Sequence, residues 1–266
     1  RMAARITVRT TADSRAPLVR GLYPVVGRDP AFDYLETRGR VLTRLPREDQ
    51  AWLERLLQDT EGRAIVGINL RPLRPDYTAG APTANVAAYT QFIETRFEER
   101  LAAAMRQFHK ASRPAPCFVF FAMNAIQFGS SDLRSAYRLK RLVRGDVDFR
   151  VWEGDPSIDG VLALLRRVDA AITMRFHATI FAVSAERHVI GVDYRPGVRD
   201  KVAALLSDLG HGDRCGRIDE VTTEWLADRL AESVGRAVAP AGESPPHGPG
   251  GLAGQGGAVF PNVARS

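Results

Sequence analysis

The chain has 266 residues, 45% hydrophobic and 26% charged, a balance typical of a globular protein that excludes wholesale disorder. Its formal net charge is +6, and only three of its 37 basic residues are lysines. The arginines are scattered along the chain and are not interleaved with aromatic residues, so the sequence does not indicate a nucleic-acid-binding surface. The charge remains compatible with a small anionic substrate.

Cysteine content and apolar runs bear on the compartment. Cys117 and Cys215 lie far apart without a Cys-x-x-Cys or Cys/His cluster, so neither a disulfide framework nor a zinc site is indicated. No run approaches the ~18 apolar residues that span a bilayer, and no charged-then-apolar leader opens the chain. We therefore expect a cytoplasmic protein without a transmembrane segment, a metal or a cofactor.

The beginning of the chain has too little regular pattern for a whole domain. Its residues indicate a strand at 6–8, a helix at 13–20 and a strand at 23–26. We interpret residues 1–33 as the end of an α/β domain whose beginning is missing. Residues 34–62 follow as a polar interdomain connection, with one helix expected around 51–57.

From residue 63 to residue 237, short apolar runs alternate with amphipathic segments. Strands are expected at 66–70, 117–123, 149–152, 170–174 and 188–194. Helices are expected at 86–108, 131–144, 157–168, 176–186, 196–208 and around 225–234. This alternation predicts an α/β fold with a Rossmann-like, doubly wound parallel sheet. Residues 238–266 are rich in Gly and Pro, and we expect them to form a disordered tail.

Polar residues follow four of the five expected strands. Because ligands of open parallel sheets bind beyond the carboxyl ends of the strands, these residues form the candidate site. The residues in question are Arg71, Asn124 with Ser131 and Asp132 just beyond it, Arg175 with His177, and Tyr194.

Arg175 and His177 are the strongest candidates. They stand where a strand passes into a helix, and the unpaired N–H groups of a first helical turn favour an anion. With Arg71, two guanidinium groups can each grip a carboxylate or a phosphate, which predicts a small ligand with two anionic groups. The His177 imidazole can exchange a proton near neutral pH.

Each candidate also has a purely structural interpretation. Arg175 could pair with Asp169 while His177 caps its helix, and Arg71 could be solvated or paired locally. Ser131 or Asp132 could be an ordinary N-cap instead of part of an anion-binding loop at 129–132. Asn124 could form a turn, and Tyr194 could simply end a strand. The grouping of Arg71, Arg175 and His177 at one edge favours a functional role for these three.

The segments Asp169-Ala-Ala-Ile-Thr-Met-Arg-Phe-His-Ala-Thr-Ile-Phe-Ala182 and Val189-Ile-Gly-Val-Asp-Tyr194 resemble the polysaccharide pyruvyl transferase family. Residues 67–72, 118–121 and 129–132 add to the resemblance, which extends in scattered blocks over roughly residues 5–208. It implies a fold similar to GT-B glycosyltransferases, of which this chain would be a fragment lacking most of the N-terminal domain.

The resemblance also implies an activity, the transfer of the pyruvyl group of phosphoenolpyruvate to a saccharide acceptor of a bacterial polysaccharide, forming a pyruvate ketal. Arg71 and Arg175 would then hold the carboxylate and the phosphate, and His177 would transfer a proton or contact the phosphate. Members of the family often carry a lysine shortly after the position of Tyr194. This chain has Arg195-Pro-Gly197 there, so that contact is expected to be lost or to move to Arg195.

Two other functions remain open from the sequence. The same sheet edge would suit the nucleotide diphosphate of a GT-B-like glycosyltransferase or a sugar-nucleotide epimerase. A non-catalytic protein of polysaccharide assembly could keep the fold without activity. The acceptor sugar, the ketal position and the oligomeric state are not indicated by the sequence.

Overall fold

The computed structural model of the protein describes residues 7–8, 25–26, 29–38, 45–78, 83–125, 131–197 and 200–237. The helix expected at 13–20, the loop residues Gly129 and Ser130, and the expected tail at 238–266 lie outside these ranges. Near the start of the chain, β1 (Thr7–Val8) and β2 (Val25–Val26) pair in parallel. They lie within the strands expected at 6–8 and 23–26.

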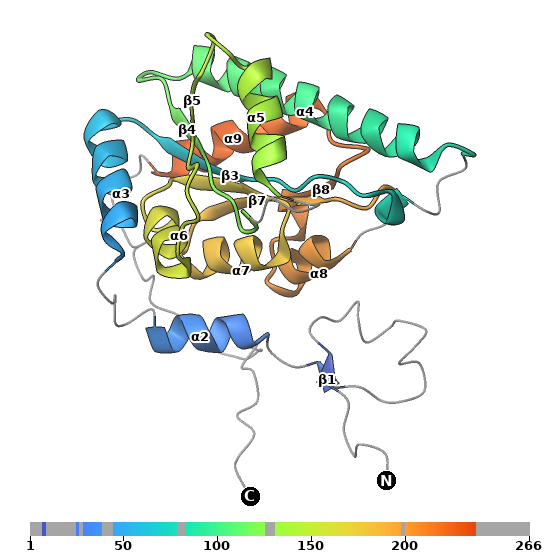
Figure 1. Ribbon diagram of the computed structural model, residues 1–266, viewed down its shortest axis with the longest axis horizontal. Helices are drawn as coiled ribbons and strands as arrows, with labels where there is room; N and C mark the ends of the chain where they lie inside the picture. Colours follow the sequence, from blue (N-terminus) through green and yellow to red (C-terminus); the bar gives the residue numbers. More distant parts are fainter. Residues whose placement is uncertain are drawn as a thin grey trace, which may run out of the picture.

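A six-stranded parallel sheet forms the centre of the protein (Figure 1). Its strands are β3 (Ile65–Asn69), β4 (Cys117–Phe120), β5 (Asp148–Val151), β6 (Ala170–Thr173), β7 (His188–Asp193) and β8 (Cys215–Arg217). Their order is β5-β4-β3-β6-β7-β8, and every neighbouring pair is parallel. The chain thus builds outward from β3 to one side and then from β6 to the other. This order confirms the expected α/β, Rossmann-like doubly wound sheet.

Helices cover both faces of this sheet (Figure 1). One face packs against α4 (Val86–Ala111), α5 (Leu133–Leu142) and α9 (Thr223–Ala237). The other face packs against α3 (Arg47–Asp59), α6 (Ile158–Leu165), α7 (Phe176–Ser184) and α8 (Lys201–Asp208), and α2 (Pro30–Arg38) packs on the outer side of α7. Because both faces are covered, the strands are almost continuously apolar, and two hydrophobic cores form, one on each side.

The longest helix, α4, shows how its sequence determines its structure. Asn85 caps its N-terminus by accepting a hydrogen bond from the backbone N–H of Ala88 at 3.0 Å. Its apolar stripe, which includes Ile93, Phe97 and Leu101, is buried against the sheet as the helical spacing predicts. Among the described residues, no helix is both long and apolar enough to cross a membrane.

Helix α2 was not expected from the sequence. Asp29 caps this helix through a 2.9 Å hydrogen bond from the N–H of Ala31, and Pro30 occupies the first helical position, where its fixed φ and missing N–H are tolerated. Leu35 packs into the core on the side of α7. The helix crosses the boundary drawn between residues 33 and 34, and the division into domains stays a prediction.

Candidate anion-binding site

Arg71 and Arg175 follow neighbouring strands at the same edge of the sheet. Strands β3 and β6 are paired, with Asn69 opposite Thr173, and the N–H of Met174 donates to the carbonyl of Asn69 at 2.9 Å. Since the strand order reverses between β3 and β6, both arginines emerge at the topological switch point. In doubly wound sheets, this is where the crevice for a ligand forms.

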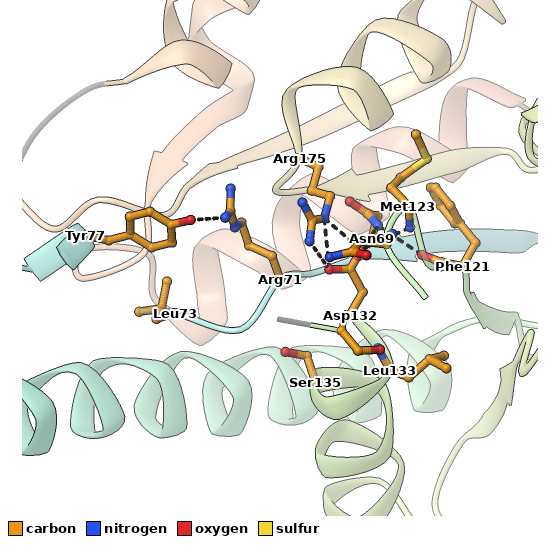
Figure 2. A network of polar contacts seen from close by, with 12 residues as sticks. Asn69, Arg71, Leu73, Tyr77, Phe121, Met123, Asp132, Leu133, Ser135 and Arg175 are labelled. Carbon is orange, nitrogen blue, oxygen red and sulfur yellow. Dashed lines mark hydrogen bonds and ion pairs between the residues drawn. The ribbon is translucent and has the colours of Figure 1, made fainter. Parts of the chain in front are cut away.

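Two tyrosines hold the Arg71 guanidinium (Figure 2). Its carbon lies 4.6 Å from the ring centre of Tyr77 and 4.5 Å from that of Tyr194, and its Nη2 donates to the Tyr77 hydroxyl. The Nε of Arg71 is buried and has no acceptor among the described residues. Burial raises the pKa of the Tyr194 phenol, and the nearby Asp200 carboxylate acts in the same direction. Tyr194 therefore remains a neutral wall beside the cation.

Asp132 holds the other arginine. The Nε of Arg175 lies 2.9 and 2.8 Å from the two carboxylate oxygens of Asp132, and its Nη2 lies 2.5 Å from Oδ1 (Figure 2). The Nη1 of Arg175 has no hydrogen-bond partner among the described residues, and the side chain is 19% exposed. This partner corrects the alternative pairing with Asp169, whose carboxylate instead accepts the N–H of Ile65 at 2.8 Å.

Asp132 itself is fully buried beneath the site. Its Oδ2 also accepts hydrogen bonds from the backbone N–H groups of Met123 at 3.0 Å and Asn124 at 3.1 Å. The amide of Asn69 lies 3.5 Å from the same oxygen. With its oxygens occupied and no exposed surface, Asp132 cannot contact a ligand directly. It positions Arg175, and it makes no side-chain cap for α5.

His177 lies at the rim, in the first turn of α7. Arg175 is the N-cap residue of this helix, so the helix amino terminus opens towards the same space as the two arginines. The imidazole is 52% exposed, and its Nε2 lies 3.8 Å from Oδ1 of Asp29, the cap residue of α2. A protonated His177 would thus face a carboxylate on one side and solvent on the other.

A cavity of about 220 Å³ joins these groups. It is lined by Arg71, Met123, Arg175, Phe176, His177, Tyr194 and Lys201. The structure therefore brings together four of the residues that the sequence singled out: the two arginines, His177 and Tyr194.

Lys201 was missed in the sequence. It begins α8, seven positions after Tyr194, and lines the cavity as its third cation. Arg195, which was expected to replace the family's lysine, is not among the lining residues, and its Nη1 lies 3.8 Å from a carboxylate oxygen of Asp200. The cavity thus has a lysine after Tyr194, only further along the chain than the sequence suggested. One feature of the sequence could have pointed to Lys201. It is one of only three lysines in the sequence, and it stands where a helix begins after an expected strand.

Two other candidates lie outside the cavity lining. The N–H of Asn124 donates to Asp132, and its carbonyl accepts the N–H of Asp132 at 2.9 Å, so its backbone braces the support of Arg175. The hydroxyl of Ser131 accepts the N–H of Leu133 at 3.3 Å, which matches the local capping alternative. No group of three or more potential metal ligands occurs in the part of the chain that the structure describes.

Comparison with solved structures finds likenesses at low identity. Heptosyltransferase II from E. coli, described as an ADP-heptose LPS enzyme, is 10% identical with a TM-score of 0.47, covering 74% of this chain and 54% of its own. A UDP-forming α,α-trehalose-phosphate synthase from Burkholderia vietnamiensis is 16% identical with a TM-score of 0.46, covering 82% and 45%. The chain thus spans about half the length of these two proteins.

Comparison by sequence is more specific. A search of curated proteins found no match. The profile of the family described as polysaccharide pyruvyl transferase matches residues 112–196, a segment that contains Asp132, Arg175, His177 and Tyr194. The resemblance seen in the sequence is therefore confirmed, and residues 112–196 carry the pattern of the polysaccharide pyruvyl transferase family.

Proposed function

We propose that this chain supplies the donor site of a transferase that moves the pyruvyl group of phosphoenolpyruvate to hydroxyl groups of a saccharide. The observation that carries the proposal is the cavity with Arg71, Arg175 and Lys201 around it and His177 at its rim. Phosphoenolpyruvate has a carboxylate and a phosphate on adjacent atoms of a three-carbon unit, so it matches a small cavity with several cations.

The size of the cavity favours a small donor over a nucleotide sugar. Its volume of about 220 Å³ lies below the ~300 Å³ at the lower end of pockets for drug-sized ligands. The cations are also available for a ligand. Nη1 of Arg175 has no acceptor among the described residues, and Lys201 makes no ion pair with any of them. Bidentate contacts from the guanidinium groups would fix the orientation of the donor.

The reaction is balanced as follows. A proton adds to the terminal CH2 carbon of phosphoenolpyruvate, which becomes a methyl group and leaves positive charge on the central carbon and its oxygen. One sugar hydroxyl forms a bond to the central carbon, and the carbon–oxygen bond to phosphate breaks. A second hydroxyl then bonds to the same carbon and completes the ketal. Of the two hydroxyl protons, one balances the proton taken up by carbon and the other leaves with phosphate.

His177 is the residue of this chain suited to move that proton. It lies at the rim, half-exposed, where an arriving acceptor would meet the donor. Arg71, Arg175 and Lys201 would stabilise the departing phosphate, and such positioned charges usually contribute most to transfer reactions of this kind. Proton transfer by a positioned imidazole adds a further ~10²–10⁴-fold.

Turnover tests the proposed function. The protein is incubated with phosphoenolpyruvate and a panel of oligosaccharides. Phosphate release is followed together with the ketal methyl resonance by proton NMR. We expect both to rise in step and both to be lost in Arg175→Lys, with Arg195→Lys as a control outside the cavity. Glycosyl transfer from a UDP-sugar without phosphate release from phosphoenolpyruvate would instead establish a glycosyltransferase.

A further inference from the structure

A second cavity, a groove, lies next to the donor site. It has a volume of about 850 Å³ and lies between the N-terminal half of α4 and the exposed side of α5. Leu73 and Pro75 form part of its lining, and they belong to the segment that runs from Arg71 to Tyr77. Arg71 lines the donor cavity. One short segment, whose residues Arg71, Leu73 and Tyr77 are drawn in Figure 2, therefore borders both the donor cavity and the groove.

Three exposed arginines line the α5 side of this groove. Arg134, Arg141 and Arg144 make no ion pair with any residue that the structure describes. Their spacing of seven and three positions places them on one side of α5 and the turn that follows it. At a rise of about 1.5 Å per residue, they extend over roughly 15 Å. An array of this length suits an extended ligand better than a single ion.

A fourth arginine of the same wall is already neutralised. The Nε and Nη2 of Arg138 lie 2.9 and 2.8 Å from the two carboxylate oxygens of Glu98, and its Nη2 also pairs with Glu94. Both glutamates are buried. Glu94 in turn accepts the N–H of Leu73 at 3.0 Å. This cluster fixes the groove wall to the segment that carries Arg71. The excess positive charge of the wall then comes from the three exposed arginines and from Lys140, whose Nζ lies 3.9 Å from a carboxylate oxygen of Glu153.

The rest of the lining suits a carbohydrate. Tyr137 lies between Arg134 and Arg141 on α5 and is 44% exposed, so part of a large aromatic ring faces the groove. Such a ring offers an apolar face and a polar tip, which match the apolar face and the hydroxyls of a sugar. The opposite wall on α4 contributes the uncharged side chains of Ala87, Thr90, Gln91 and Thr95.

We propose that this groove binds an acidic glycan, the acceptor chain of the reaction, through carboxylate or phosphate groups that pair with Arg134, Arg141 and Arg144. Tyr137 stacks on a sugar between these contacts. The identification of the glycan as acceptor rests on the proposed function, whereas binding in the groove does not. A chain that lies along α5 would pass the segment from Arg71 to Tyr77 and reach the donor cavity beside it.

Binding is measured by calorimetry at low ionic strength. The probes are oligomers of galacturonic acid, phosphorylated oligosaccharides and neutral galactose oligomers of equal length. Substitution of Arg134, Arg141 and Arg144 by Ala removes the three ion pairs that we propose with the glycan, so we expect acidic probes to bind about tenfold more weakly. The matched control replaces Arg47, Arg55 and Arg167, three exposed arginines on the other side of the sheet, by Ala. It should leave binding unchanged, and added salt should weaken binding to the native protein.

Several results would overturn the groove proposal: equal binding of acidic and neutral probes, equal loss in both triple variants, or equally tight, arginine-dependent binding of single-stranded DNA. Arg141→Glu provides a second, single-site variant, and its effect should exceed that of Arg141→Ala. Phosphoenolpyruvate binding separates the two proposals, because the triple groove variant should keep it. If phosphoenolpyruvate fails to bind the native protein while acidic probes still depend on the groove, the proposed function fails and the groove remains.

Discussion

The carboxylate of Asp132, fully buried, pairs with the Arg175 guanidinium through Nε and Nη2 and leaves Nη1 without a partner among the described residues. The arginine thus reaches the cavity with its orientation already fixed. A free arginine would lose side-chain entropy on binding a ligand, and here much of that cost has been met in folding. The pair therefore links the stability of the fold to the binding of an anion.

Substituting Asp132 by Asn should impair both properties. The change leaves the Arg175 charge without its partner in a largely buried place, which costs about 3 kcal/mol of unfolding free energy. Urea denaturation measures this loss. The control is Asp146→Asn, which breaks an exposed ion pair with Arg106. The side chain of Asp146 is 54% exposed and that of Arg106 is 40% exposed. That change should cost less than about 1 kcal/mol, and an equal cost for both variants would contradict the positioning role of Asp132.

Lys201 provides a test that separates the structure from the sequence resemblance. Lys201→Met keeps the length and apolar stem of the side chain but removes the third cation of the cavity. We expect phosphoenolpyruvate to bind about tenfold more weakly, the equivalent of one charge-assisted contact. Lys140→Met is the control, since Lys140 lies on α5 away from the cavity. Unchanged binding in Lys201→Met would remove this residue from the site.

The part of the site predicted from sequence depends on strand geometry alone. Arg71, Arg175 and Tyr194 follow directly on β3, β6 and β7, so a parallel sheet brings them to one edge whatever the details of the loops. His177 follows in the first helical turn after β6. Lys201 could not be found in this way, because it lies seven positions beyond Tyr194 and the sequence between them shows no periodicity.

Other features were missed for equally specific reasons. Strand β8 has three residues, one of them Gly216, and so lacks both the length and the alternation by which strands are recognised. Helix α2 begins with Asp29-Pro30, a pair that suits a turn as well as a helix start. The burial of Asp132 beneath Arg175 depends on a contact between residues 43 positions apart, which no local pattern can reveal.

His177→Ala should separate chemistry from binding. Because the imidazole lies at the rim and the cations surround the cavity, the affinity for phosphoenolpyruvate should change no more than a few-fold. The turnover number should fall by about 10²–10⁴, the usual contribution of a general acid or base. Kinetics with a saccharide acceptor measure both quantities. His211→Ala, in the turn before β8, serves as control, and a His177 variant with native turnover would exclude the proton-transfer role.

The stability of the protein should depend on pH through Glu98. Burial raises the pKa of this carboxyl from 4.5 to about 7, although the Arg138 guanidinium lowers it in part. Between these values the folded protein binds more protons than the unfolded chain, so stability is highest below pH ~4.5 and falls as the pH rises to about 7. The loss is at most roughly 3 kcal/mol.

Glu98→Gln should abolish this part of the pH dependence. Chemical denaturation from pH 4.5 to pH 7.5 compares the native protein with this variant and with Glu99→Gln, in which an exposed neighbour on the same helix is changed. The difference in unfolding free energy between native and Glu98→Gln protein should shift steadily over this range. Parallel curves for the two proteins would show that Glu98 does not ionise in this window.

Calorimetric titration with phosphoenolpyruvate tests the central claim most directly, since it asks whether the cavity of Arg71, Arg175 and Lys201 holds the donor. The native protein should bind phosphoenolpyruvate and not a UDP-sugar, and Arg175→Lys should weaken binding at least tenfold because an ammonium cannot replace the guanidinium fork. Binding of the UDP-sugar alone, with that binding lost in His177→Ala, would contradict the account.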